Sequence, residues 1–140
     1  MTYAEQEKRI VQPGFTFMEL VVAVLILGIL ASVAGFAYLQ FVGTAKESAT
    51  KASLKSVKSA IDLYHIQHNK YPTRLRDLVE RPKGEIKGWK PAFEKMPKDG
   101  WGNEFYYKVT PGKKHPYELY SYGSEGPEGS AEERISVWDL

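Results

Sequence analysis

The chain contains no cysteine, and neither charge sign is in large excess. The missing cysteine excludes a disulfide framework, a thiolate metal site and a thiol nucleophile. With 19 Lys and Arg against 17 Asp and Glu, the net charge of +2 is too small to predict nucleic-acid binding. A hydrophobic fraction of 43% excludes a wholly disordered chain. The 140 residues therefore predict one small domain.

Charge is missing altogether from Leu20 to Leu39, where Ser32 and the Tyr38 hydroxyl are the only polar side-chain groups. Twenty apolar residues form a helix of about 30 Å, which is enough to cross a bilayer. We therefore expect residues 15–40 to be a transmembrane or filament-core helix. Residues 41–140 remain to form a soluble head.

Proline is absent between Gly14 and Pro72, so nothing in the sequence ends the helix early. Apolar residues recur at helical spacing in its second half, namely Leu54, Val57, Ile61 and Tyr64. We predict one helix from about Thr16 to about His68. Its first half is apolar on all faces, and the apolar stripe of its second half packs on the head.

The head contains short segments with the composition of strands. Residues 104–109 and 117–121 flank a Pro-Gly turn and predict an antiparallel hairpin, to which residues 135–138 could add a third strand. Residues 73–80 predict a helical turn or two. The expected fold is α+β, a long N-terminal helix whose second half packs on a small antiparallel sheet.

Candidate catalytic and metal-binding residues are few. His65 and His68 lie three residues apart, but no third ligand of matching character lies near them in sequence. Ser121, His115 and Asp99 could be combined into a nucleophilic triad, yet no Gly-x-Ser-x-Gly elbow surrounds the serine. Phosphate-binding and zinc signatures are also missing. We therefore expect that the protein is not an enzyme.

The segment before the apolar run departs from a secretory signal, since the run is longer than the 7–15 residues of such a signal and a Gly-Phe junction precedes it. The sequence Gly14-Phe15-Thr16-Phe17-Met18-Glu19-Leu20 resembles the class III signal of type IV prepilins and type II secretion pseudopilins. The resemblance implies a leader peptide of residues 1–14, removed by a prepilin peptidase that cuts between Gly14 and Phe15 and methylates Phe15 on its new amine.

Glu19 has two readings. The resemblance implies that Glu19 meets the amine of Phe15 on a neighbouring subunit, and that pairing would offset the desolvation of both charges. Alternatively, the carboxylate lies among lipid headgroups and only favours the helix N-terminus through the helix dipole.

The head sharpens the resemblance. Its motifs look like consecutive landmarks of the major pseudopilins of type II secretion, in order Tyr71-Pro72-Thr73, Leu75 and Leu78, Trp89, Asp99-Gly100-Trp101-Gly102-Asn103, Phe105 and Tyr107, Pro111-Gly112, and Glu118 to Gly126. They cover nearly the whole mature chain. The missing cysteine pair also favours this family over type IV pilins, many of which close a C-terminal loop with a disulfide. One departure lies in the helix, where Phe36 stands at a position at which the family commonly has proline.

The C-terminal segment is acidic, with six carboxylates and one cation, Arg134, from Glu118 onwards, whereas residues 46–116 carry sixteen cations and eight carboxylates. In major pseudopilins the equivalent loop binds calcium. The resemblance points to the carboxylates of Glu125, Glu132 and Glu133 and to the Tyr122 carbonyl as ligands, although this chain has Glu where the family prefers Asp. The alternative is a solvated tail held by Arg134 and neighbouring lysines.

The resemblance implies a type IV pilin-like fold and a structural subunit of the periplasmic pseudopilus, which drives export of folded proteins through the outer membrane. It implies a single-pass protein of the inner membrane with its head in the periplasm. The implied partners are further copies of the chain in a helical filament, the prepilin peptidase, minor pseudopilins, an inner-membrane assembly platform and, before assembly, membrane lipid. The alternative is a pilin-like subunit of another filament, used for adhesion, motility or DNA uptake.

Overall fold

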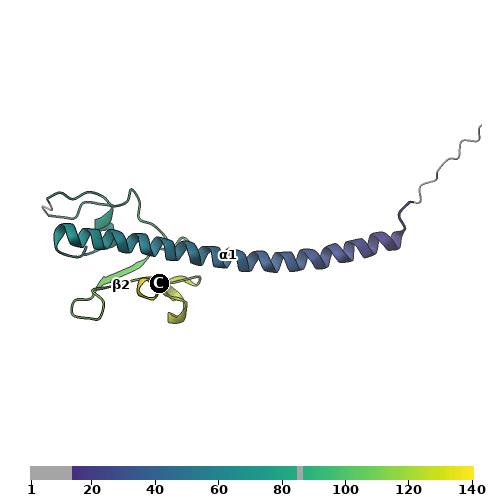
Figure 1. Cartoon of the computed structure of the whole chain (residues 1–140). Coiled ribbons are helices and arrows are strands. Elements are labelled where there is room, and N and C mark those ends of the chain that lie inside the picture. The colour runs from purple at the N-terminus through teal and green to yellow at the C-terminus, as the bar shows by residue number, and fades with distance from the viewer. Residues whose placement is uncertain (1–13, 85–86) are drawn as a thin grey trace, which may run out of the picture. The chain divides into compact units, whose positions relative to one another are not determined.

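The computed structural model describes residues 14–84 and 87–140, so the predicted leader, apart from Gly14, lies outside the described residues. The chain divides into two compact units, Met1–Gln40 and Phe41–Leu140. The helix α1, Phe17–His68, contributes to both units (Figure 1), which confirms the single long helix expected from the sequence.

In the first unit, α1 exposes its apolar side chains. From Val22 to Leu39, the large apolar side chains are between 47% and 70% exposed, and Phe36 is 67% exposed. By length and composition this part of α1 can cross a membrane. A helix that is apolar on all faces needs lipid or protein around it, so this unit is built for an environment other than water.

In the second unit, α1 has one buried face. The predicted apolar stripe is confirmed, because Leu54, Val57 and Ile61 are fully buried and Tyr64 is 6% exposed. These side chains pack with Tyr117 and the other buried apolar residues of the head, which are Ala60, Leu78, Phe105, Leu119 and Val137.

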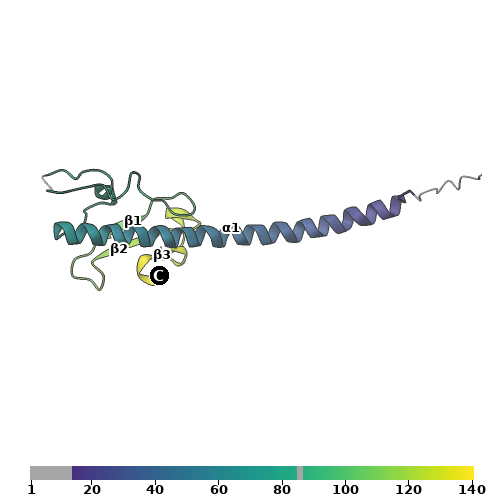
Figure 2. The same ribbon diagram turned by 45° about the horizontal axis from the view of Figure 1, so that its top comes forward.

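The sheet has three antiparallel strands in the order β1-β2-β3, labelled beside α1 in Figure 2. Their bounds are β1 Tyr106–Val109, β2 Tyr117–Ser121 and β3 Ile135–Ser136. Along β2, buried residues alternate with half-buried ones, so Tyr117, Leu119 and Ser121 face the core. The fold is α+β, as the sequence predicts.

Three predicted boundaries were too wide. Residues 104–105 precede β1, and the helical turn predicted over 73–80 is the short η1, Leu75–Leu78. Residues 137–138 do not extend β3 but belong to the turn η4, Val137–Asp139. The Ser136 hydroxyl accepts a hydrogen bond from the Trp138 amide at 3.2 Å, and the Trp138 indole donates to the Tyr117 carbonyl at 2.9 Å. These bonds turn the chain out of the strand direction.

Candidate functional site

Gly14 and Phe15, the predicted cleavage junction, are exposed ahead of α1, and Phe15 is 93% exposed. A Cβ added at Gly14 would meet no atom within 4 Å. The fold therefore places no demand for glycine at this position. The cleavage prediction instead places the requirement for glycine in a peptidase that holds the backbone closely.

Thr16 and Glu19 form a reciprocal capping box at the start of α1. A Glu19 carboxylate oxygen accepts hydrogen bonds from the Thr16 amide at 2.8 Å and the Thr16 hydroxyl at 3.0 Å, while the Glu19 amide donates to that hydroxyl at 3.2 Å. This arrangement satisfies amides at the helix N-terminus. Sequence reasoning missed this role, although the Thr-x-x-Glu spacing signals it. Glu19 thus has a hydrogen-bonding partner within its own chain.

Asp99 is the centre of a buried hydrogen-bond network in the head. One carboxylate oxygen accepts from the Trp101 amide at 3.0 Å and the Asn103 amide at 2.8 Å. The other accepts from the Ser121 hydroxyl at 2.7 Å, and that hydroxyl accepts from the Gly123 amide at 3.0 Å. The network joins the turn at residues 99–103 to β2 and to the start of the acidic loop, by which we mean residues 123–133.

The three residues of the nominal triad do not form one. Ser121 is fully buried and hydrogen-bonded to Asp99, whereas the His115 ring stacks on Trp138 with ring centroids 4.2 Å apart. His65 stacks on Tyr71 at 4.1 Å, and His68 packs against Tyr64. Among residues 14–84 and 87–140, no three His, Cys, Asp or Glu side chains are grouped closely enough to hold a metal ion.

The turn after Asp99 requires glycine at position 100 because its backbone lies against α1. The Gly100 amide donates to the Thr50 hydroxyl at 2.8 Å, and that hydroxyl donates to the Lys46 carbonyl at 2.8 Å. A Cβ at Gly100 would overlap the Lys46 carbonyl, so only glycine lets the turn lie against α1. Thr50 is fully buried although it is polar, because both of these bonds satisfy it.

The acidic loop bonds largely to itself. The turns η2, Gly126–Glu128, and η3, Ala131–Glu133, shape it. The Glu125 carboxylate accepts from the Ser130 amide at 3.4 Å, and the Glu133 carboxylate accepts from the Ser124 hydroxyl at 3.3 Å. Two of the predicted calcium ligands are thus on one loop but already serve as its internal acceptors. A carboxylate has two oxygens and several lone pairs, so these single bonds leave it able to bind a cation, and calcium binding stays a prediction.

Arg134 lies over two tyrosine rings, 5.1 Å from the centroid of Tyr120 and 5.9 Å from that of Tyr122. Such cation–π contacts hold the strand end beside the loop. The alternative reading expected Arg134 to hold the tail, and the contacts show which groups it touches. The aromatic partners could not be read from the sequence.

Two core tyrosines have perturbed acidity. The Tyr117 hydroxyl donates to Asp62 at 3.2 Å, and burial, followed by the charge of that carboxylate, raises the pKa of Tyr117. The Tyr107 hydroxyl donates to the Pro72 carbonyl at 2.8 Å, and burial raises the pKa of Tyr107. Both rings therefore stay neutral in the folded head and act as hydrogen-bond donors.

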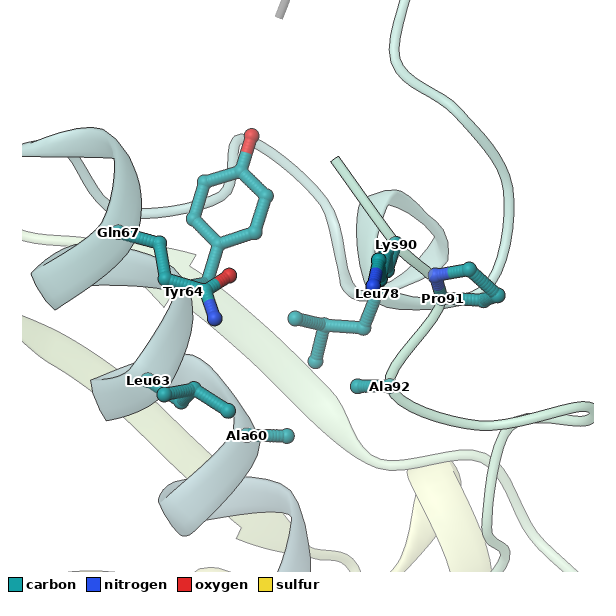
Figure 3. Close-up of a pocket in the computed structure, with 8 residues that line it drawn as sticks. All are labelled: Ala60, Leu63, Tyr64, Gln67, Leu78, Lys90, Pro91 and Ala92. Carbon is teal, nitrogen blue, oxygen red and sulfur yellow. The ribbon is translucent and has the colours of Figure 1, made fainter. Parts of the chain in front are cut away.

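A cavity of about 220 Å³ lies between α1 and the segment that follows it (Figure 3). Leu78 points toward α1 in this view, and the lining is mainly apolar: Ala60, Leu63, Tyr64, Gln67, Leu78, Lys90, Pro91 and Ala92. No carboxylate lines it. The cavity marks where the segment from 75 to 92 rests on the helix.

Comparisons with known proteins find matches for both the N-terminal segment and the head. The family described as "Type II secretion system (T2SS), protein G" matches residues 37–138, and the prokaryotic N-terminal methylation motif matches residues 11–35. The chain is similar to the type II secretion system core protein G of Pseudomonas aeruginosa, with 36% identity, 91% of this chain and 96% of the relative covered. Identity to the core protein G of Vibrio cholerae is 34%, with 84% of each chain covered.

A solved structure agrees. The major pseudopilin from the type 2 secretion system of enterohaemorrhagic Escherichia coli superimposes with a TM-score of 0.60 and 26% identity, covering 70% of this chain and 87% of that one. The match supports a type IV pilin-like fold. The family match over residues 37–138 and the similarity to these relatives show that the chain belongs to the protein G family of type II secretion systems, the major pseudopilins.

Proposed function

We propose that this chain is the repeating structural subunit of a periplasmic pseudopilus that drives folded proteins through the outer membrane. The observation that carries the proposal is the continuity of α1, which leads from exposed apolar residues into the buried core of the head. One element thus serves as both anchor and scaffold. The alternative of a pilin-like subunit in another filament is disfavoured, since the family match spans the head.

Processing precedes assembly in this proposal. A prepilin peptidase cuts between Gly14 and Phe15 and methylates Phe15, and the methylation motif over residues 11–35 supports this step. The mature chain then waits in the inner membrane as a single-pass protein with its head in the periplasm. The capping bond from Thr16 occupies Glu19 until the Phe15 amine of a neighbour replaces it.

When a subunit moves from the membrane into the filament, α1 exchanges lipid neighbours for protein neighbours, and both are apolar. Lipid tails are as apolar as leucine, so packing α1 against other copies gains little from the hydrophobic effect. Polar contacts must therefore give assembly its order. Glu19 supplies one such contact, and minor pseudopilins and an inner-membrane assembly platform are the proposed partners that start and drive polymerisation.

Calcium is a proposed ligand of the acidic loop. Its hard oxygen donors would be the carboxylates of Glu125 and of Glu132 or Glu133, with the Tyr122 carbonyl. Bound there, calcium would join the loop to the end of β2. The support is the chemistry of the donors and their position on one loop, and the Asp99 network already fixes one end of that loop through Gly123.

A deletion strain tests the function directly. Removing the gene should abolish export of type II substrates while leaving them folded in the periplasm, and the wild-type gene supplied in trans should restore export. A strain lacking this chain that exports normally would refute the proposal. Loss of adhesion, motility or DNA uptake with normal export would instead support the alternative filament.

A further inference from the structure

The Asp99 network ends on the peptide group that carries a proposed calcium ligand, the Tyr122 carbonyl. The Gly123 amide donates to the Ser121 hydroxyl at 3.0 Å. This N–H belongs to the same peptide group as the Tyr122 carbonyl. Because that group is planar and trans, its N–H and its C=O point in opposite directions. The bond to Ser121 therefore fixes the direction of the Tyr122 carbonyl oxygen.

Asp99 in turn fixes the orientation of the Ser121 hydroxyl. The hydroxyl donates its one proton to Asp99 at 2.7 Å, so its lone pairs are left to accept the Gly123 amide. The Asp99 side chain is itself held, because its other oxygen accepts two amides of the turn at residues 99–103. An orientation set in this turn is thus passed through one hydroxyl to the start of the acidic loop.

Asp99 and Ser121 lie behind the loop and not on its surface. The Asp99 side chain is 6% exposed and Ser121 is fully buried, whereas the carboxylates of Glu125 and Glu133 are exposed. A cation that reaches the loop from solvent therefore meets the two glutamates. The buried pair can act on it only by placing other ligands.

Gly123 also closes the neck of the acidic loop. Its φ of 79° is one that glycine adopts readily, and a Cβ there would overlap the Glu133 carbonyl oxygen. A second close approach lies within the loop, where a Cβ at Gly129 would overlap the Glu125 side chain. Two glycines thus let the backbone of the loop pack against a carbonyl and a carboxylate. The Asp99 network holds the first of these contacts in place.

The oxygens of the loop fit calcium by their chemistry. Calcium takes about six to eight oxygen ligands, and backbone carbonyls are common among them. In the parts of the chain that the structure describes, no three His, Cys, Asp or Glu side chains group together, so side chains alone do not supply such a shell. Backbone carbonyls would have to contribute, and the Tyr122 carbonyl is one whose direction is already fixed.

We propose that Ser121, held by Asp99, is a positioning residue for calcium, which sets the Tyr122 carbonyl and the neck of the acidic loop before the ion binds. The inference rests on the proposed binding of calcium to this loop. A ligand that is already in place needs less ordering when the ion binds, and the affinity is higher for that reason. Removing an outer residue that orients a metal ligand typically weakens metal binding about 10- to 100-fold.

Calorimetric titration of the full-length chain in detergent with calcium chloride tests the proposal. Ser121→Ala removes the acceptor of the Gly123 amide and should raise the Kd for calcium about tenfold. Ser121→Cys keeps the volume and a weak donor to Asp99 but offers only a weak acceptor, so it should show a similar loss. Circular dichroism before each titration checks that the variant is folded.

Asp99→Asn separates position from charge. The asparagine carbonyl can still accept the amides of the turn, and its NH2 group can donate to Ser121, whose remaining lone pair still accepts the Gly123 amide. This variant should therefore weaken calcium binding less than Ser121→Ala does. A larger loss from Asp99→Asn would show that the charge of Asp99 matters and would overturn the positioning role.

Thr110→Val is the matched control. It also removes a buried hydroxyl, which donates to the His115 carbonyl at 2.9 Å at the other end of the hairpin from the loop. It should lower stability in urea as Ser121→Ala does, yet leave the Kd for calcium unchanged. Hydrogen exchange in calcium-free protein gives a second readout, since the Gly123 amide should exchange faster in Ser121→Ala and not in Thr110→Val.

The outcomes separate this inference from the proposal on which it rests. If the wild type binds calcium and folded Ser121→Ala binds it equally tightly, the positioning role is wrong and the calcium site stands. An equal loss of affinity in Thr110→Val would also overturn the role, because it would trace the loss to general stability. If the wild type binds no calcium, the calcium proposal fails and this inference with it, whereas the export assay alone decides the function as a filament subunit.

Discussion

The Ser121 hydroxyl donates a hydrogen bond to the Asp99 carboxylate at 2.7 Å, and both side chains are buried. Ser121→Ala would leave a carboxylate oxygen and the Gly123 amide without this partner. Leaving buried polar groups unsatisfied costs about 1–3 kcal/mol, so the free energy of unfolding of the head should fall by about that amount. Urea unfolding of the chain in detergent, followed by near-ultraviolet circular dichroism, measures it. Ser124→Ala, which removes an exposed hydroxyl, should change little.

Processing at Gly14 gives a second prediction. Gly14→Val should leave the precursor uncut, because the peptidase must approach the backbone while the fold itself leaves space for a side chain. Mass spectrometry of membrane-extracted wild-type protein should find a chain that begins with N-methylated Phe15. A mature chain that begins elsewhere would contradict the assignment.

Glu19→Gln should weaken filament assembly while membrane insertion and head folding stay normal. Glutamine can still serve in the Thr16 capping box, but it has no charge to offer the amine of a neighbour. Thr16→Val is the matched control, since it removes the hydroxyl of the cap and keeps the carboxylate. Crosslinking of cysteines introduced in α1 reports assembly. Full filament yield from Glu19→Gln would leave Glu19 only its role at the helix N-terminus.

Calcium should stabilise the head if the acidic loop binds it. Ligand that binds only the folded state adds RT ln(1 + [L]/Kd), which is about 2.7 kcal/mol at a hundredfold excess over Kd. Magnesium should do less, because its octahedral shell fits a flexible loop of carboxylates and carbonyls poorly. Glu125→Ala should abolish the response, and Glu118→Ala, outside the loop, should keep it. Equal melting temperatures in millimolar calcium and in chelator would reject the site.

Alkaline pH should destabilise the head through Tyr117. Its pKa in the folded head lies above the value of about 10 for an unfolded tyrosine, so the folded state keeps a proton that the unfolded chain releases. Stability is therefore full below pH 10 and falls as the pH rises above it. Tyr117→Phe should cost about 1 kcal/mol at pH 7, from the lost bond to Asp62, and should flatten the alkaline fall. A steep fall unchanged by this substitution would contradict the assignment.

Periodicity and local motifs in the sequence determined α1 and its two parts, an apolar first half and a second half with one buried face. The charge-free run from Leu20 to Leu39 and the stripe from Leu54 to Tyr64 are patterns that one helix period reveals. The hairpin was also predicted, since turn residues between two aromatic runs are a local signal. The Thr16–Glu19 capping box also has a local signature, the Thr-x-x-Glu spacing, although it was not among the predictions from the sequence.

Tertiary structure alone decided how the head is held together. Ser121 and Asp99 are 22 residues apart, Gly100 and Thr50 are 50 apart, and Tyr117 and Asp62 are 55 apart. No spacing rule links such pairs, because they meet only after the sheet packs on α1. The same packing cut β3 short at Ser136.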